Sequence, residues 1–296
     1  MLAAVFSIAL GSLLLGQVRS PRERDLYVSV ENAAGAPVAN LAAADFAVRE
    51  DGMAREVLKV APATSPIELT LLVDNSAVSS AIIADLRRAL TDFVGEMAPG
   101  NEIAITTFGG NPEVLQTYTG NPVLLKNSIG RLFPNTGTGA YLLEAILSVA
   151  KGVEKRAPQR PALLAVLARS APEFSNQYPG PVVAALKACG ARFDAITVEG
   201  STAEAPEPPP GTEIARAAQY RDQVLDEGTR ATGGQNEHAI SSLALAGRMK
   251  AIGAALRSQY LVTYARPESL IPPERIEVSV KGRGLTAHGT PVRTGR

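Results

Sequence analysis

The stretch that most constrains the fold is residues 68–80, where an apolar segment ends abruptly in an acid followed by small hydroxylated residues. Residues 69–73 form a near-continuous apolar run, Asp74 ends it, and a helical pattern begins at Ile82. Strands that are apolar on both faces belong to parallel sheets covered by helices on each side. Such sheets place their sites beyond the carboxyl ends of the strands, where Asp74 and Ser76 are expected.

Alternation of strand and helix continues along the chain and predicts a doubly wound, mostly parallel α/β sheet flanked by helices. Further strands are predicted at residues 101–108, 113–118, 162–168, 193–198 and, as the last strand of this sheet, 260–264. Helical spacing of apolar residues is found over residues 82–97, 123–132, 141–156, 182–189, 212–227 and 240–257. Residues 113–118 follow too short a connection for a crossover helix, which predicts an antiparallel hairpin. Residues 201–211, which contain Glu-Pro-Pro-Pro, are expected to form an exposed loop.

Both ends of the chain show the alternating pattern of half-buried strands instead. Apolar residues recur at every second position at Leu26, Val28 and Val30 and again at Ile276, Val278 and Val280. We therefore expect an N-terminal β segment over residues 25–63, the α/β domain over residues 66–265 and a C-terminal β segment over residues 266–296. The two β segments are expected to pair into one small accessory β domain.

The N-terminus resembles a secretory signal peptide. Residues 1–16 carry no charged side chain, and basic residues follow at Arg19, Arg22 and Arg24. The apolar stretch is shorter than a membrane span. No basic residue precedes it and no clear Ala-x-Ala site ends it, so an uncleaved anchor is the alternative. We expect residues 1–20 to be a signal peptide or N-terminal anchor, and the protein to be exported to the periplasm or the extracellular space.

Composition excludes several classes of partner. Lys plus Arg and Asp plus Glu both total 29, so no global field draws the protein to nucleic acid or to an anionic membrane. Membrane attachment is expected only through an uncleaved N-terminal segment. The single cysteine, Cys189, rules out an internal disulfide framework and a cysteine-based zinc site.

Asp74 and Ser76 have two interpretations on sequence alone. Carboxylate and hydroxyl oxygens on a tight loop suit Mg²⁺ or Ca²⁺, but the same residue types cap helices. Thr138, in the glycine-rich loop 135–139, adds a hydroxyl at the same edge. That loop lacks the Gly-Lys-Ser/Thr ending of a phosphate loop, so nucleotide binding is not expected. No cofactor is expected, and Mg²⁺ is the ion that Asp74, Ser76 and Thr138 could hold in an incomplete site.

Catalysis by Ser76 would require a base and an orienting acid beside it. The two histidines are His238, at a predicted helix start, and His288, in the C-terminal segment. Ser76 also lacks the Gly-x-Ser-x-Gly pattern of a nucleophile elbow. We expect no catalytic residue and no enzyme, with a serine-dependent hydrolase using Ser76 as the alternative.

Together these features resemble the von Willebrand factor A fold, in particular that of exported bacterial proteins with such domains. The likeness rests on four segments, at residues 40–52, 71–76, 139–146 and 252–264. In metal-binding members an Asp-x-Ser-x-Ser loop, a threonine on a second loop and an aspartate on a third hold Mg²⁺, and a carboxylate of the partner completes the coordination. The resemblance implies an adhesion or protein-binding module.

The sequence departs from that metal site at three positions. It keeps Asp74 and Ser76, but Val78 replaces the second serine and Ala140 aligns with the threonine, which leaves only Thr138 on the second loop. The third loop carries Arg169 in place of the aspartate, or Ser170 if the alignment slips by one residue. A guanidinium there would repel a dication. We hypothesise that Arg169 pairs with Asp74 and occupies the place of the metal; the alternative is that Arg169 points to solvent.

The expected function is that of an exported, non-enzymatic binding module with little or no metal dependence. Its ligand-binding rim would comprise Asp74, Ser76, Thr138 and Arg169, and its partner would be an unidentified protein or surface ligand. Besides the hydrolase, a structural scaffold with a lost site remains an alternative.

Overall fold

The computed structural model describes residues 22–199, 209–267, 271, 273 and 275–292. The predicted signal peptide or anchor at residues 1–20 and most of the predicted exposed loop at 201–211 lie outside the described residues. No helix in the described ranges is long and apolar enough to cross a membrane.

The larger part of the molecule is built on a six-stranded sheet in the order β10-β9-β8-β5-β6-β7. Its strands are β5 (Glu68–Val73), β6 (Glu102–Thr107), β7 (Glu113–Thr119), β8 (Pro161–Ala168), β9 (Arg192–Val198) and β10 (Asn236–Ala239). All neighbours are parallel except β6 and β7, which form the predicted antiparallel hairpin. Every residue of β8 is buried, as its apolar run requires of a strand covered on both faces.

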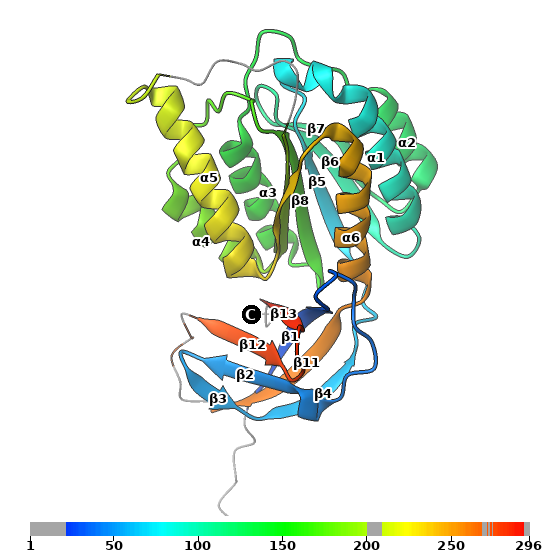
Figure 1. The fold of residues 1–296 in the computed structure, drawn as a ribbon, viewed down its shortest axis with the longest axis vertical. Coiled ribbons are helices and arrows are strands. Elements are labelled where there is room, and N and C mark those ends of the chain that lie inside the picture. The colour runs from blue at the N-terminus through cyan, green and yellow to red at the C-terminus, as the bar shows by residue number, and fades with distance from the viewer. Residues whose placement is uncertain (1–21, 200–208, 268–270, 272, 274, 293–296) are drawn as a thin grey trace, which may run out of the picture.

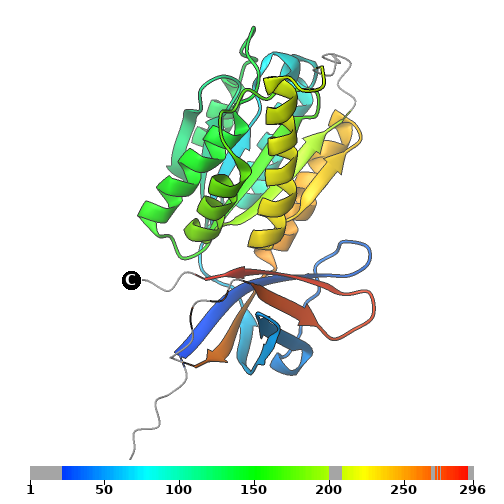
Figure 2. The ribbon, with the colours of Figure 1, turned by 90° about the vertical axis from the view of Figure 1, so that its left-hand side faces the viewer.

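Helices cover both faces of this sheet (Figures 1 and 2), which confirms the predicted doubly wound α/β fold. One face carries α1 (Ile83–Met97), α2 (Pro122–Gly130) and α6 (Leu245–Arg257), and the other carries α3 (Leu142–Arg156), α4 (Pro179–Cys189) and α5 (Glu213–Thr232). Helix α1 buries Leu86, Leu90 and Phe93, which lie on one helical face. Short 3₁₀ turns, η2 (Ala77–Ala81) and η3 (Ser242–Ala244), precede α1 and α6, so α6 begins five residues later than the predicted start at 240.

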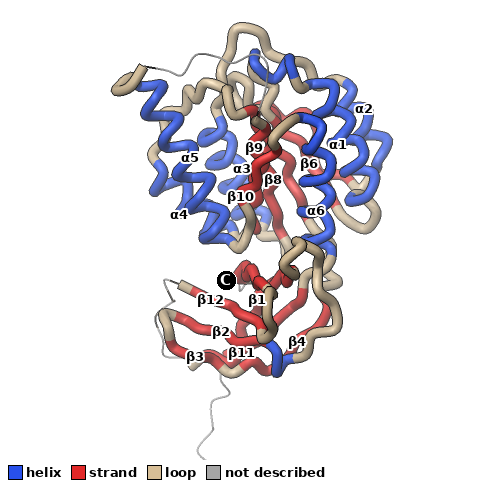
Figure 3. The backbone as a smooth tube through the Cα atoms, viewed as in Figure 1, coloured by secondary structure: helices blue, strands red, loops and turns tan. Residues whose placement is uncertain are grey.

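The accessory β domain expected from the two ends of the chain is present (Figure 3). One antiparallel sheet has the order β13-β1-β11-β4 and the other the order β12-β2-β3. The strands are β1 (Arg22–Glu31), β2 (Phe46–Glu50), β3 (Met53–Arg55), β4 (Val57–Pro62), β11 (Tyr260–Arg266), β12 (Ile276–Val280) and β13 (Thr286–Pro291). A 3₁₀ turn, η1 (Ala43–Asp45), precedes β2. Leu26, Val28, Phe46 and Tyr264 belong to the core of this domain.

Strand β11 corrects one prediction. Residues 260–264 were expected to form the last strand of the α/β sheet, but β11 pairs with β1 and β4 in the β domain. The burial pattern explains the difference, because buried and half-buried residues alternate along β11 while the inner strands of the parallel sheet are buried throughout. The α/β layers therefore end with α6.

Polar contacts fix the β domain against the amino ends of the parallel strands. Arg192, at the start of β9, forms a buried ion pair with Asp194 and also donates to Ser29 of β1. Arg160 donates to the carbonyls of Ala63 and Ser65 in the connection from β4 to β5. The carboxyl ends of the strands, and the loops that follow them, thus lie at the end of the molecule away from the β domain (Figure 1).

Candidate functional site at the carboxyl edge of the sheet

Asp74 follows β5 directly and is fully buried. Its Oδ1 accepts from the backbone N–H of Ser76 at 2.8 Å, and its Oδ2 accepts from the N–H of Ala168, the last residue of β8, at 3.0 Å. Burial raises the pKa of the Asp74 carboxyl, against the opposing effects of these hydrogen bonds and of the Arg221 guanidinium. The carboxyl group therefore joins two neighbouring strands inside the protein.

Ser76 lies beside this carboxyl group and is also fully buried. Its hydroxyl is near enough to favour the charged form of Asp74, yet Ser76 Oγ has no partner of hydrogen-bond geometry. The Ser76 carbonyl accepts from the Ser79 hydroxyl at 2.7 Å and so holds the start of η2. Ser76 thus stabilises the start of η2 and is not accessible to solvent.

Hydrogen bonds of Asn75 and Asn135 join the loops that follow β5, β6 and α2, and we call this set of bonds the clamp. Neither residue was predicted from sequence. Asn75 Oδ1 accepts from the N–H of Gly109 at 2.7 Å, while the N–H of Asn135 donates to the Asn75 carbonyl at 2.6 Å. Asn135 Nδ2 in turn donates to the Gly109 carbonyl at 2.8 Å. A Cβ on Gly109 would lie 2.2 Å from the backbone nitrogen of Ser76, so the clamp requires glycine there.

Thr138 lies in the loop between α2 and α3, at the edge where it was expected. Its hydroxyl donates to the Asn135 carbonyl at 2.8 Å, and its own carbonyl accepts from the N–H of Ala77 at 3.1 Å. The fold thus brings Thr138 next to the Asp74 loop through the backbone. Ala140, at the position aligned with the metal-binding threonine, is fully buried.

Arg169 does not pair with Asp74, contrary to our hypothesis. Arg169 is exposed, its N–H donates to the Val198 carbonyl at 2.8 Å, and no ion pair among the described residues includes it. The pairing fails because the Asp74 carboxyl turns inward to backbone N–H groups. The guanidinium that does act on Asp74 is that of Arg221, which is buried on α5.

The donors at this loop do not fit a divalent cation. Both oxygens of the single carboxylate already accept backbone hydrogen bonds, and the Thr138 hydroxyl is engaged with Asn135. Ser76 Oγ is the one buried oxygen of this loop without a partner, and Mg²⁺ requires six oxygen ligands in near-ideal geometry. Across the described ranges, no three His, Cys, Asp or Glu side chains gather to hold a metal ion.

Sequence reasoning missed a second buried acid, Glu173, in the loop between β8 and α4. Its Oε1 accepts from the N–H of Leu142 at 3.1 Å and from both the N–H and the hydroxyl of Ser175. Its Oε2 is buried without a partner. Burial raises the pKa of Glu173 to about 7. No motif marks Glu173 in the sequence, because its surroundings come from α3 and α5.

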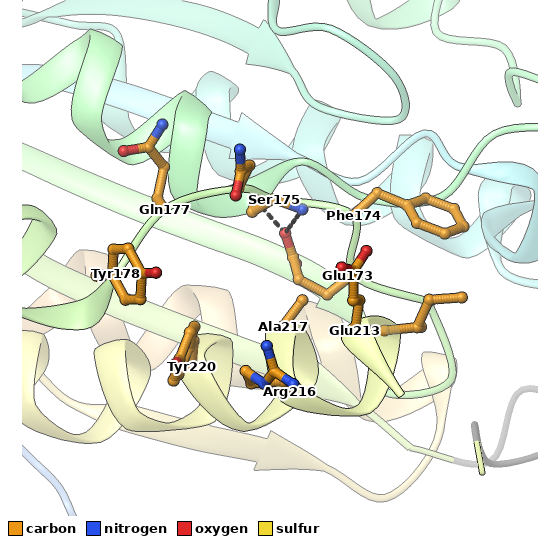
Figure 4. Close-up of a pocket in the computed structure, with 11 residues that line it drawn as sticks. Glu173, Phe174, Ser175, Gln177, Tyr178, Glu213, Arg216, Ala217 and Tyr220 are labelled. Atoms are coloured by element: carbon orange, nitrogen blue, oxygen red, sulfur yellow. Dashed lines mark hydrogen bonds between the residues drawn. The ribbon is translucent and has the colours of Figure 1, made fainter. Parts of the chain in front are cut away.

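A cavity of about 350 Å³ opens beneath this loop, between it and the first turns of α5. Glu173, Tyr178 and Tyr220 are among the residues that line it (Figure 4). The rings of Tyr178 and Tyr220 lie 5.7 Å apart between centroids at an angle of 49°. The cavity thus combines an aromatic wall with a buried acid.

Aromatic side chains mark the outer surface of the same edge. The exposed aromatic residues in the described part of the chain are Phe133, Phe174 and Tyr178, at 64%, 40% and 67%. All three lie on the loops between α2 and α3 and between β8 and α4. We call these three residues the aromatic rim. Ile240, in the loop after β10, and Leu243, in η3, are also exposed.

The two histidines lie away from Ser76. His238 is on edge strand β10, three strands from β5, and its Nδ1 lies 3.2 Å from Glu199. Three strand spacings are about 14 Å. His288 is on β13 in the β domain. Neither histidine hydrogen-bonds to Ser76 Oγ.

Fold and edge define a doubly wound α/β domain whose candidate site lies beyond the carboxyl ends of its strands. A family model for the von Willebrand factor type A domain matches residues 69–168, which is about a third of the chain and runs from β5 through β8. This part of the chain is similar to von Willebrand factor type A domains. No curated protein matches the chain.

Several solved structures are similar to the chain at low identity. BatB, a conserved hypothetical protein from Bacteroides thetaiotaomicron, is 15% identical over 65% of this chain and 100% of that chain, with a TM-score of 0.46. A von Willebrand factor type A structure from Catenulispora acidiphila is 13% identical over 95% and 75%, with a TM-score of 0.48. The corresponding domain of the type V pili tip protein Mfa5 from Porphyromonas gingivalis is 11% identical over 64% and 95%, at 0.46.

Proposed function

We propose that this protein is a non-enzymatic binding module that recognises another protein through the loops at the carboxyl edge of its α/β sheet. The observation that carries the proposal is the aromatic rim, because Phe133, Phe174 and Tyr178 are the exposed aromatic residues of the described chain and share one edge. Aromatic side chains are enriched in protein interfaces and dominate their binding energy.

Recognition in this proposal does not depend on a metal. Both oxygens of the buried Asp74 carboxyl already accept from backbone N–H groups, so a dication would have to compete with these bonds. Arg169 stands exposed on the same edge, where its charge would disfavour a cation and could instead contact the partner.

The hydrolase alternative receives no support from the geometry. Ser76 Oγ is buried, and no histidine lies within hydrogen-bond reach of it. A serine nucleophile requires a positioned base and access to substrate. The scaffold alternative predicts that changes at the rim leave partner binding unchanged, and a comparison of rim variants tests this.

We also propose that the protein is exported, to the periplasm or the extracellular space. Support comes from the uncharged, apolar residues 1–16 and the arginines that follow them. A fusion of residues 1–30 to alkaline phosphatase, which is active only outside the cytoplasm, should give active enzyme in a bacterial host. An inactive fusion would argue for a cytoplasmic protein.

A peptide selection tests the binding proposal while the natural partner is unidentified. Displayed peptides are selected on the immobilised full chain, and the affinity of the enriched peptides is then measured for variants. Combined Phe133→Ser and Phe174→Ser changes should weaken binding by at least about tenfold, the loss expected of hot-spot aromatics. The matched control, Val123→Ser with Leu124→Ser, removes exposed apolar side chains in the first turn of α2 and should leave affinity unchanged.

The same measurement in Mg²⁺ and in chelator addresses metal dependence, and the affinities should agree. Rim variants that bind as tightly as the unchanged chain would contradict the proposed surface. Loss of binding in chelator would contradict metal independence.

A further inference from the structure

The loop between β8 and α4 holds a buried acid, Glu173, that has only one of its two carboxylate oxygens hydrogen-bonded. Glu173 is fully buried, and its Oε1 accepts three hydrogen bonds while its Oε2 accepts none. A buried carboxylate oxygen without a partner destabilises the protein that contains it, and such groups are rare. The site therefore lacks a hydrogen-bond donor.

A second acid shows the same incomplete pairing beside the same loop. Glu144, in the first turn of α3, accepts from the N–H of Asn176 at 2.7 Å through Oε1, and its Oε2 is buried without a partner. Glu173 and Glu144 thus hold residues 173–176 from within, each with one oxygen to spare. Of these two acids, Glu173 is the one that lines the cavity.

The neighbouring arginines do not supply those donors. Arg221 of α5 donates to the Ala171 carbonyl and to Asp222, and acts on Glu173 only through space. Arg216 and Glu213, both exposed on α5, also line the cavity, and their charges are equal and opposite. The charge balance of the cavity lining is therefore acidic.

The shape and the walls of the cavity suit a long basic side chain. Figure 4 shows the Glu173 carboxyl bonded to Ser175 of its own loop, with Tyr178 and Tyr220 farther along the cavity. The rings of these tyrosines can attract a cation that passes over them. A volume of about 350 Å³ accommodates one arginine side chain with accompanying water.

We propose that this cavity takes an arginine or lysine side chain, with Glu173 as the counter-ion and Tyr178 and Tyr220 as the flanking wall. The side chain belongs to the partner, and in that respect the inference rests on the proposed function. A guanidinium is the better fit, because its planar set of donors pairs with a carboxylate in a fixed geometry. The partner would accordingly present a basic residue to this edge.

A titration with two small probes tests the cavity alone. N-acetyl-arginine amide is added to the ¹⁵N-labelled full chain at pH 8, and backbone NMR shifts are followed; N-acetyl-citrulline amide, equal in shape but uncharged, is the control. The arginine probe should shift residues 173–178 and the first turns of α5, with a dissociation constant of about 1 mM, typical of a small fragment. The citrulline probe should bind at least about tenfold more weakly.

Variants and pH sharpen the assignment. Glu173→Gln should weaken binding of the arginine probe by at least about tenfold, whereas Glu213→Gln at the exposed mouth should change it by less than about threefold. Because burial raises the pKa of Glu173 to about 7, a cation must displace a proton at lower pH. Affinity for the arginine probe should therefore fall about tenfold from pH 8 to pH 6.

Equal affinities for the arginine and citrulline probes would overturn the inference, as would full retention of binding in Glu173→Gln. The probe comparison uses the unchanged chain, so it decides the matter even if Glu173→Gln does not fold. If the probes fail to discriminate but the rim variants weaken peptide binding, the cavity inference is wrong and the proposed function stands. If the arginine probe binds specifically but the rim variants have no effect on peptide binding, the proposed rim surface is wrong and the cavity assignment stands.

Discussion

Asp74 and Glu173 are both buried acids that follow neighbouring strands of the sheet, yet they use their oxygens differently. Each carboxylate oxygen of Asp74 accepts from a backbone N–H, and these bonds join its loop to the end of β8. Glu173 concentrates three donors on one oxygen and leaves the other unpaired beside a cavity. Burial raises the pKa of both carboxyl groups.

The difference shows that the residue at a motif position need not be the residue that is free to bind a ligand. Asp74 occupies the position at which the resemblance expects a metal ligand, but both of its oxygens accept hydrogen bonds from the backbone. Glu173 belongs to no motif, and it has the unused oxygen. We therefore treat the Asp74 loop as structural and the Glu173 loop as the recognition element.

The largest predicted effect comes from breaking the clamp around the Asp74 loop. A Cβ at Gly109 would lie 2.2 Å from Ser76 N and 2.3 Å from the Asn75 carbonyl carbon, and backbone atoms cannot move aside locally. Gly109→Ala should lower the free energy of unfolding by about 4 kcal/mol in urea denaturation. Gly130→Ala, where a Cβ meets nothing within 4 Å, is the control and should leave stability near that of the unchanged chain. A loss at Gly109 below about 1 kcal/mol would show that the clamp is loose.

A second prediction uses the pKa of Glu173. A carboxyl group whose pKa is raised from 4.5 to about 7 by folding binds more protons in the native state, so its contribution to stability is fully present below the unfolded value and is lost as pH rises. Between pH 4.5 and pH 8 the unchanged chain should lose about 3 kcal/mol relative to Glu173→Gln. Urea denaturation of both proteins at several pH values measures this difference. A stability difference that does not change with pH would mean that folding does not raise the pKa of Glu173.

The third prediction contrasts Asp74 with Arg169. Asp74→Ala leaves two buried backbone N–H groups unpaired and should cost about 2 kcal/mol of stability. Arg169→Ala removes an exposed side chain with no ion pair among the described residues and should change stability by less than about 0.5 kcal/mol. Equal losses in denaturation would revive the hypothesis that the two residues pair.

Much of the fold could be predicted because its signals are local. The near-continuous apolar run of β5 and the wholly apolar run of β8 identify inner strands directly. The spacing of Leu86, Leu90 and Phe93 identifies a covering helix. Strand β11 was placed in the wrong sheet because its alternation of buried and half-buried residues appears only once its neighbours are known. Strand β10, with the sequence Asn-Glu-His-Ala, has no apolar pattern to detect.

The candidate site was predictable only in part. Asp74, Ser76 and Thr138 were expected at one edge, and the structure brings their loops together. The direction of the Asp74 carboxyl and the isolation of Arg169 depend on which backbone groups lie nearby, which a sequence does not specify. Glu173 was missed for the same reason, since its environment comes from α3 and α5.

The claim that the Asp74 loop is closed to metal is tested most directly by the melting temperature of the full chain in Mg²⁺, Mn²⁺ and Ca²⁺ against chelator. A cation that binds only the folded state at one hundred times its dissociation constant stabilises it by about 2.7 kcal/mol. For a chain of this size that is a rise of roughly 4 °C. We predict equal melting temperatures in all four conditions. A clear rise with any of the cations would contradict the account and return Asp74 to the binding site.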